Sequence, residues 1–467
     1  MGRLLDLLNA VIWGMPTLIL ILGVGIYISI RTGFVQLRLF PKALRDFCRQ
    51  LTGKEKKDGI SSYQALCTAL AATVGTGNLA GVAGAIAIGG PGAIFWMWVC
   101  GFFGMATKFA EAVLAIRYRE KNSAGEFIGG PMYMIRNGLG RNSQWLSGLY
   151  CFFGVVASFG VGNATQINTV INGFNSALTA VGGKVTDSGN IIMGILLAIL
   201  ITAMLLGGAK KIGIVAERLV PFASVAYLLL GAAVLVIKAD AISDAFRAII
   251  IGAFNPRSVT GGLLGSSFAA LRVGASRGVF TNEAGMGTAS IAHASATVKH
   301  PVEQGMMGIM EVFVDTIVIC TMTALVILCS GVAIPYGTDT GIVLTSDAFS
   351  CVLGQWVNIP IALALCCFAI ATVLGWGLYG IRCAQFLFGE NAWRGFAILQ
   401  GVMVIVGSIL NTQTVWLLAE CVNGLMAIPN LFALALLTPQ LRIITLQYKT
   451  DQYKVLGYGH RQPKSTF

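Results

Sequence analysis

The chain alternates between long apolar runs and short polar connections. A helix needs about 20 residues to cross the roughly 30 Å hydrocarbon layer of a bilayer. Eleven apolar segments reach or approach that length. They lie at 11–30, 62–90, 92–116, 145–172, 190–207, 219–237, 262–295, 305–330, 357–381, 395–412 and 414–437. The pattern predicts an all-α polytopic membrane protein with 11 transmembrane helices.

The distribution of positive charge predicts the orientation of these spans. With 31–61 placed in the cytoplasm, 24 of the 32 Lys and Arg residues fall in cytoplasmic segments, five fall outside and three lie within spans. Cytoplasmic loops carry such an excess of positive residues. We therefore expect a multi-pass protein of the cell membrane, either an inner or a plasma membrane, with its N-terminus outside and its C-terminus in the cytoplasm.

Composition supports the lipid bilayer as the solvent of this chain. Only 11% of the residues are charged, whereas soluble domains average roughly 25%. The net charge of +12 follows from the cytoplasmic loops and does not indicate a nucleic-acid partner. Nearly all of the eleven Cys lie inside apolar runs, and only three His are present. We expect neither a zinc site nor a haem site, and no cofactor other than a coupling ion.

Two spans contain residues that interrupt a helix at mid-membrane depth. The second span holds Gly75, Gly77 and Asn78 within 70–81, and the seventh holds several Gly and an Asn within 274–287. Each Gly costs a helix about 1 kcal/mol relative to Ala. Interrupted helices at corresponding positions of two halves indicate an inverted-repeat transporter.

The repeat divides the chain into four segments. Each half has five spans, an odd number, so the two halves lie in opposite orientations, as an inverted repeat requires. The segments are an extra N-terminal transmembrane helix with a basic cytoplasmic segment (1–61), the first five-helix repeat (62–237), the second five-helix repeat (238–437) and a cytoplasmic tail (438–467).

Such breaks have a chemistry of their own. Amides at the start of a half-helix attract a carboxylate, and carbonyls at the end of the other half coordinate sodium or an ammonium group. An amino-acid zwitterion together with sodium satisfies both. The alternative interpretation is that the glycines only permit close helix packing. Two breaks at corresponding positions argue against this interpretation.

Three motifs at these places resemble the alanine/glycine:cation symporter family, also called the sodium:alanine symporter family. They are Ala-Ala-Thr-Val-Gly-Thr-Gly-Asn-Leu-Ala-Gly-Val (71–82), Gly-Gly-Pro-Met-Tyr-Met (129–134) and Ser-Arg-Gly-Val-Phe-Thr-Asn-Glu-Ala-Gly-Met-Gly (276–287). The resemblance runs from about 10 to 440. It implies a LeuT-type fold, a 5+5 inverted repeat plus one helix, that imports alanine or glycine with sodium by alternating access.

The first break is the predicted centre of the binding site. We expect backbone amides here to hold the substrate carboxylate and backbone carbonyls just before it to hold sodium. The amides belong to Gly75, Thr76, Gly77 and Asn78, and the carbonyls to Ala71, Ala72 and Val74.

Other spans are expected to complete the site. Gln166 places an uncharged amide at mid-depth, where it binds either end of a zwitterion or another helix. Phe280 and Asn282 flank the second break, where carbonyls are expected to take the ammonium group and Phe280 to line the methyl pocket. Thr372 and Trp376 share one face of the ninth span. The resemblance implies that Thr372 contributes a hydroxyl to sodium or substrate and that Trp376 caps the pocket and limits substrate size.

Buried ionisable residues are functional candidates by default. For Glu283 we favour an ion pair with Arg272, Arg277 or Lys108 over a direct role with ammonium, sodium or a proton. Glu111 lies one helical turn from Lys108, which predicts a structural ion pair. The roles of Glu311 and Asp315, a proton relay or help with sodium, stay open.

Alternative functions are a LeuT-type carrier for glutamine, serine or another substrate, which could be proton-coupled, and a channel. The sequence lacks the H-E-x-x-H, G-x-S-x-G and Walker motifs, so we expect neither an enzyme nor an ATP-driven pump. No obligatory protein partner is evident.

Overall fold

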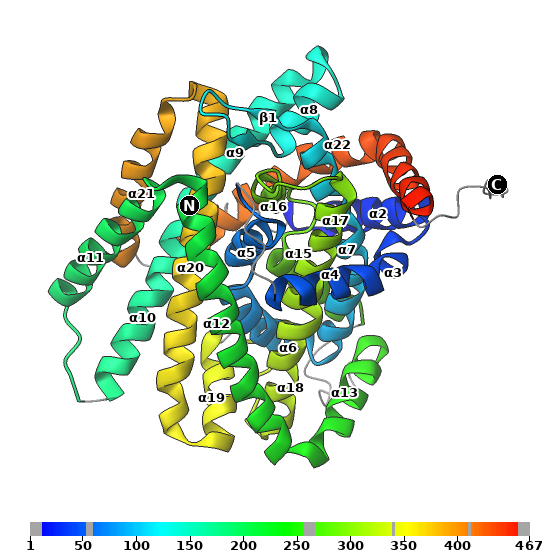
Figure 1. Cartoon of the computed structure of the whole chain (residues 1–467). Helices are drawn as coiled ribbons and strands as arrows, with labels where there is room; N and C mark the ends of the chain where they lie inside the picture. Colours follow the sequence, from blue (N-terminus) through cyan, green and yellow to red (C-terminus); the bar gives the residue numbers. More distant parts are fainter. Residues whose placement is uncertain are drawn as a thin grey trace.

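A computed structural model describes residues 12–52, 59–180, 182–255, 267–338, 341–409 and 412–455. This part of the chain is almost entirely helical (Figure 1). The helices are α2 (Met15–Arg31), α3 (Val35–Arg38), α4 (Phe40–Thr52), α5 (Ser62–Thr73), α6 (Val82–Gly89), α7 (Gly92–Tyr118), α8 (Pro131–Gly138), α9 (Gln144–Phe159), α10 (Thr165–Ala180), α11 (Asp187–Leu205), α12 (Gly208–Ile237), α13 (Ile242–Phe254), α15 (Ser267–Asn282), α16 (Thr288–His293), α17 (Pro301–Val312), α18 (Thr321–Ser330), α19 (Ile342–Leu353), α20 (Asn358–Phe388), α21 (Ala392–Ile409) and α22 (Thr412–Val455).

Short segments complete the described chain. An antiparallel hairpin pairs β1 (Glu120–Lys121) with β2 (Phe127–Ile128). Wider, π-helical turns occupy Gly77–Gly81, Gly160–Ala164 and Phe313–Cys320, and 3₁₀ turns lie at Arg141–Ser143, Ala239–Ala241 and Gln355–Val357.

Within the described residues, eight helical segments are long and apolar enough to cross a membrane, and the bent pair Ser62–Thr73 and Gly77–Gly89 makes a ninth. Two expected spans are not among them. The span at 11–30 is the 17-residue helix α2, and the span at 262–295 is α15 followed by the six-residue α16. The first residues of both expected spans, at 11 and at 262–266, lie outside the described residues. The total of eleven therefore stays a prediction.

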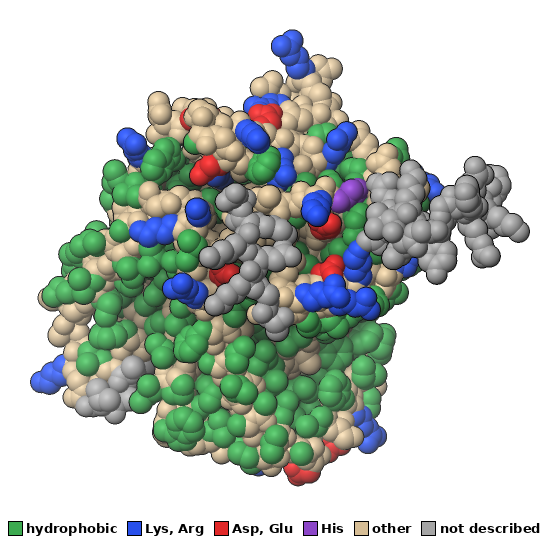
Figure 2. Space-filling model, in the orientation of Figure 1, with side chains coloured by type: hydrophobic (Ala, Val, Ile, Leu, Met, Phe, Trp, Pro, Cys, Tyr) green, Lys and Arg blue, Asp and Glu red, His purple; other side chains and the backbone are tan. Residues whose placement is uncertain are grey.

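The surface is that of a multi-pass membrane protein. In Figure 2 hydrophobic side chains cover most of the lower part of the molecule, and Lys and Arg gather mainly above them. Leu196 and Ile199 of α11 and Leu229 of α12 are 58, 64 and 66% exposed. Large apolar side chains exposed in such number fit lipid better than water.

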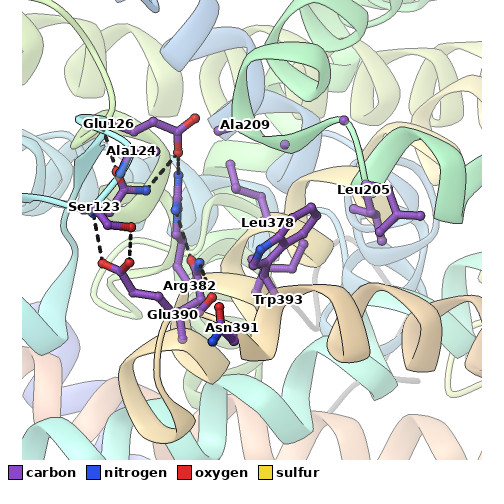
Figure 3. Close-up of a pocket in the computed structure, with 16 residues that line it drawn as sticks. Ser123, Ala124, Glu126, Leu205, Ala209, Leu378, Arg382, Glu390, Asn391 and Trp393 are labelled. Atoms are coloured by element: carbon purple, nitrogen blue, oxygen red, sulfur yellow. Dashed lines mark hydrogen bonds and ion pairs between the residues drawn. The ribbon is translucent and has the colours of Figure 1, made fainter.

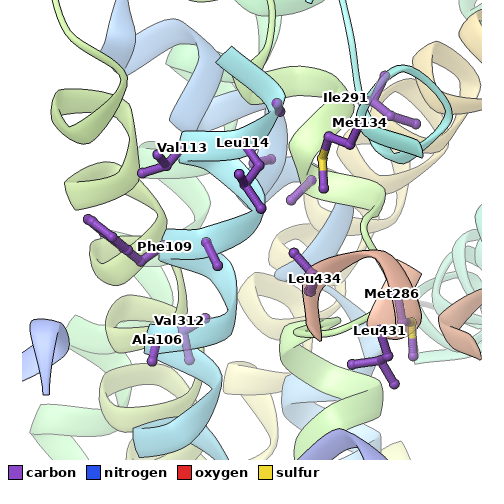
Figure 4. Packing of buried hydrophobic residues seen from close by; sticks show 14 of the residues in the cluster. Ala106, Phe109, Val113, Leu114, Met134, Met286, Ile291, Val312, Leu431 and Leu434 are labelled. Atoms are coloured by element: carbon purple, nitrogen blue, oxygen red, sulfur yellow. The ribbon is translucent and has the colours of Figure 1, made fainter. Parts of the chain in front are cut away.

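Helix α7 lies at the centre of one half of the bundle, where it packs against α15 and α17. Figure 4 shows its residues Phe109 and Val113 within a buried apolar cluster. The close contact depends on Gly: a Cβ at Gly305 would lie 2.5 Å from Val113, and one at Gly308 would lie 2.8 Å from the backbone of Lys108. Small residues allow membrane helices to approach in this way.

A second group of helices, α10, α11, α20 and α21, stands on the left in Figure 1. Small residues again set the contact between α11 and α21. A Cβ at Gly194 would lie 2.2 Å from the Ser408 hydroxyl, and one at Gly401 would lie 2.1 Å from that of Thr202. From these two groups, α7 packs against α6 and α16, and α20 packs against α5 and α16, which are parts of the bent segments described next.

Both predicted interruptions are confirmed. After α5 the chain leaves helical geometry at Val74, and the two half-helices differ in direction by 54°. After α15 the chain passes through left-handed backbone at Glu283, Gly285 and Gly287, with φ of +52°, +97° and +79°, before α16 begins. Gly tolerates such φ values without steric cost, so the glycines of this motif fit the turn they form.

The sharpest backbone contact predicts a stability effect. An ideal Cβ at Gly92 would lie 2.1–2.2 Å from backbone atoms of Gly252 and Ala253 in α13. Gly92→Ala should therefore lower the free energy of unfolding by about 1–3 kcal/mol through overpacking, measured as thermal unfolding in detergent. The matched control is Gly23→Ala, whose Cβ would meet nothing within 4 Å. Equal behaviour of both variants would contradict the α7–α13 contact.

Candidate functional site

Asn78 organises the backbone of the first break. Its side-chain oxygen accepts the N–H of Gly75 at 2.8 Å, and its own N–H donates to the carbonyl of Gly75 at 3.3 Å. Within the described chain, the structure gives no hydrogen-bond acceptor to the amides of Thr76 and Gly77. Of the four amides expected to hold a carboxylate, these two are therefore available at the start of the second half-helix, where the helix dipole favours an anion.

Side chains from α10 and α20 meet the first break at Gly75. A Cβ placed there would lie 2.9 Å from the hydroxyl oxygen of Thr372 and 4.0 Å from the amide oxygen of Gln166. Gln166 also donates to the hydroxyl of Thr76 at 3.3 Å. The structure thus brings together Gly75, Thr76, Gln166 and Thr372 from three helices, all of them buried. Together they present amide and hydroxyl groups around a position that has no side chain.

The expected sodium ligands lie on the other side of the break. Helix α5 ends at Thr73, and the last carbonyls of a helix lack helical partners. Ala71 and Ala72 belong to this last turn. Helix α20 packs directly on it, because a Cβ at Gly375 would lie 2.9 Å from that of Ala72. Thr372, one turn earlier, donates its hydroxyl hydrogen to the carbonyl of Phe368 at 2.9 Å, so its oxygen faces the break as an acceptor.

At the second break, the side chains of Asn282 and Phe280 have contacts within the protein. The Asn282 side chain accepts the N–H of Ala284 at 3.0 Å and donates to the Thr316 hydroxyl at 3.1 Å. The ring of Phe280 lies edge-on to Trp13, with ring centroids 6.4 Å apart. Thr281, which the sequence did not single out, is the residue that approaches the first break: a Cβ at Gly77 would lie 3.5 Å from it.

Asp315 connects the two breaks, a role that its sequence position left open. Its carboxylate accepts from the Asn78 amide at 2.7 Å and from the Thr316 hydroxyl at 2.9 Å. Thr316 in turn accepts from Asn282. The result is a buried chain of hydrogen bonds from the first break through the π-helical segment Phe313–Cys320 to the second. In the sequence, an acid beside a hydroxyl residue in an apolar span marked this position as a candidate. The residues that bond to Asp315 could not be predicted from it.

The prediction of an ion pair between Lys108 and Glu111 is wrong. Lys108 pairs with Glu311 of α17 at 3.0 Å, and Glu311 also contacts His293 at 2.8 Å. One oxygen of Glu111 instead accepts the backbone N–H groups of Gly285 and Gly287, both at 3.0 Å, and the Asn430 amide at 2.8 Å. A carboxylate of the protein therefore already occupies the amides of the second break.

Glu283 does not form the ion pair that we favoured. Among the described residues, its carboxylate accepts only from the Thr288 hydroxyl at 2.6 Å and from the indole N–H of Trp376 at 3.1 Å. Trp376 is fully buried, one turn beyond Thr372 on α20.

A separate pocket of about 340 Å³ lies near the β1–β2 hairpin (Figure 3). Arg382 of α20 contacts Glu126 there at 3.2 Å, and Ser123 bonds to Glu390. None of the predicted binding residues lines this pocket. It is therefore distinct from the cluster around Gly75.

Comparison with known proteins identifies relatives along nearly the whole chain. The model of the sodium:alanine symporter family matches residues 1–457. The chain is 42% identical to the sodium/alanine symporter AgcS of Methanococcus maripaludis, over 93% of this chain and 94% of that protein. It is 36% identical to the probable sodium/glutamine symporter GlnT of Bacillus subtilis, over 93% and 88% of the two chains.

The fold is similar to that of a solved transporter. The crystal structure of MhsT in complex with L-phenylalanine superposes with a TM-score of 0.55 at 16% sequence identity, covering 84% of this chain and 99% of that chain. MhsT has a LeuT-type fold, so the likeness shows a LeuT-type arrangement of helices here.

The Lys108–Glu311 contact yields a test of the buried network. Lys108→Met would leave Glu311 as a buried carboxylate without its ammonium partner, and should cost about 3–5 kcal/mol of stability, measured by thermal unfolding in detergent. Lys108→Met/Glu311→Leu should recover most of that loss, because both charges are then absent.

The control is the partly exposed pair Arg136–Glu120, with side chains 33 and 39% exposed. Arg136→Met should cost less than about 1 kcal/mol, because water screens such pairs. If Lys108→Met and Arg136→Met lowered the stability equally, the buried pair would not be what stabilises the contact between α7 and α17.

Proposed function

Because the chain belongs to the sodium:alanine symporter family and is therefore a sodium-coupled amino-acid symporter, we propose that its substrates are small neutral amino acids, alanine and glycine, which it imports by alternating access.

The observation that carries this proposal is the space at Gly75. A methyl group on this residue would already touch the Thr372 hydroxyl at 2.9 Å. The amides of Thr76 and Gly77 suit the substrate carboxylate, and the side chain of Gln166 suits either end of the zwitterion. Backbone carbonyls near Phe280 and Asn282 are proposed to take the ammonium group, and Phe280 to line the methyl pocket. A site this close to glycine backbone on one side and to a Trp on another favours a short side chain.

We place sodium at the end of α5, between the carbonyls of Ala71, Ala72 and Val74 and the hydroxyl of Thr372. Carbonyl and hydroxyl oxygens are hard ligands of the kind that half-helix ends offer to sodium in such folds. Thr372 would then touch both the ion and the region of the substrate, so that binding of one strengthens binding of the other.

The membrane potential supplies the driving force for uphill transport. Each positive charge that moves inward gains about 2.3 kcal/mol per 100 mV. One sodium ion carried with a neutral zwitterion therefore supports roughly 50-fold accumulation, before any sodium gradient is added.

The proposed architecture has eleven transmembrane helices, with the extra helix and basic segment at 1–61, the inverted repeats at 62–237 and 238–437, and the tail at 438–467. Helix α22 continues into that tail as far as Val455. The chain is a multi-pass membrane protein, and we propose that its N-terminus lies outside and its C-terminus inside.

A second candidate is a carrier for glutamine or serine, with protons as an alternative coupling ion. Besides the probable glutamine symporter above, the chain is 32% identical to the putative sodium/proton-dependent alanine carrier YrbD of Bacillus subtilis, over 95% of this chain. Alanine fits the cluster around Gly75 better than glutamine does, because glutamine is longer by three heavy atoms.

Uptake of labelled alanine into proteoliposomes tests the proposal. We expect uptake with an inward sodium gradient and none when choline replaces sodium. Gly75→Ala should abolish uptake, because its methyl would meet Thr372, and Gly77→Leu should do so by filling the space toward Thr281. Gly81→Ala is the matched control within the same bent helix, since its Cβ would meet only the Thr281 hydroxyl at 3.8 Å.

Absence of alanine uptake under both conditions would contradict the substrate while leaving the fold intact. Glutamine uptake and a proton gradient would be measured next. Normal uptake by Gly75→Ala would instead place the binding site elsewhere.

A further inference from the structure

Trp376 lies where a wall of the substrate site is needed. It follows Thr372 by one turn of α20, about 6 Å along the helix, and Thr372 adjoins the first break at Gly75. Helix α20 runs toward the β1–β2 hairpin, where Arg382 meets Glu126. In the proposed orientation the indole therefore lies between the substrate site and the cytoplasm. Its side chain is fully buried.

On one side the indole rests against backbone. A Cβ at Gly162, in the π-helical segment Gly160–Ala164, would lie 2.4 Å from the Cβ of Trp376 and 2.9 Å from its ring atom Cδ2. No side chain other than hydrogen fits at that position. Gly162 therefore supports the indole on the side of its Cβ and Cδ2 atoms, and Tyr379 lies edge-on to the ring with the ring centroids 5.8 Å apart.

On the other side Glu283 holds the N–H edge of the indole. Its Oε1 accepts the indole N–H at 3.1 Å, and its Oε2 accepts the Thr288 hydroxyl at 2.6 Å. Glu283 has a left-handed φ of +52°, unusual for a residue with a side chain. Its N–H still closes the last turn of α15 on the carbonyl of Val279 at 2.8 Å. The break in the helix thus aims this carboxylate at Trp376.

The neighbouring buried carboxylates have other tasks. Glu311 binds Lys108 and His293, and Glu111 binds the amides of Gly285 and Gly287. Among the described residues, Glu283 is the one of the three that hydrogen-bonds to α20. Hydrogen bonds are directional and weaken steeply when the donor turns away from the acceptor, so this contact is well suited to fix a large ring in one orientation.

We propose that Glu283 is a positioning residue that holds the Trp376 indole against the substrate site and thereby sets the size of the amino acid accepted. This inference rests on the proposed function. Glu283 acts through Trp376 and does not touch substrate. When its acceptor is removed, the indole can leave its orientation, the wall recedes, and longer amino acids gain affinity relative to short ones.

The test is a competition assay in the presence of sodium. It compares the affinities of the shortest and longest amino acids that the wild type binds, beginning with alanine and glutamine. Glu283→Ala and Trp376→Phe should each raise the affinity for glutamine relative to alanine by up to about tenfold, the upper range of what one hydrogen bond contributes. The double variant should show no further change, because each single substitution removes the same contact.

The conservative variant Glu283→Gln should keep the wild-type ratio. Its one side-chain oxygen can accept the indole N–H, and its NH₂ group can donate to the Thr288 hydroxyl, which then acts as acceptor. If Glu283→Ala fails to fold, Trp376→Phe, which loses the N–H but keeps a ring, carries the same expectation.

Equal loss of affinity for all amino acids in Glu283→Ala, or additive effects in the double variant, would overturn the inference, because a purely structural residue acts on every substrate alike. Failure of the proposed function shows separately, as wild-type protein that does not bind alanine with sodium. The selectivity ratio can still be measured with the amino acids that it does bind.

Discussion

The structure depends on how the backbone groups freed by two broken helices are satisfied inside a membrane. Water is scarce there, and each unpaired N–H or C=O costs several kcal/mol. The freed backbone groups are satisfied in different ways at the two breaks. At the second, the Glu111 carboxylate takes the amides of Gly285 and Gly287. At the first, Asn78 takes only that of Gly75, and the amides of Thr76 and Gly77 have no acceptor in the described chain.

This asymmetry gives the two breaks separate tasks. Because a protein carboxylate already occupies the amides of the second break, the first break is the one at which we propose that the substrate carboxylate binds. The second break instead positions side chains. Asn282 reaches the Thr316 hydroxyl, and through it Asp315 and Asn78, while Glu283 reaches Trp376. A shift of either half-helix would break contacts that begin at the other, which would couple the proposed ion and substrate sites to helix movement.

Close packing by small residues makes these polar contacts achievable. Gly305 and Gly308 bring α17 onto α7, and the Lys108–Glu311 pair spans the same contact. Gly375 and Gly162 bring α20 against the end of α5 and against the π-helical segment Gly160–Ala164 in the same way. Buried charges without partners are too costly for a membrane interior, so the short interhelical distances and the ion pairs support one another.

The sequence by itself determined the helical membrane class, the two interruptions and the residues at the first break. These follow from local properties: run length, the weak helix preference of Gly and Asn, and motifs of consecutive residues. It could not determine which partners the buried polar groups take. Glu111 is one turn from Lys108, yet Lys108 bonds to Glu311 about 200 positions away, and Glu283 bonds to Trp376 rather than to a nearby Arg. The tertiary structure decided these pairings, because side chains choose partners by distance in space, and spacing along one helix says nothing about which other helix packs against it.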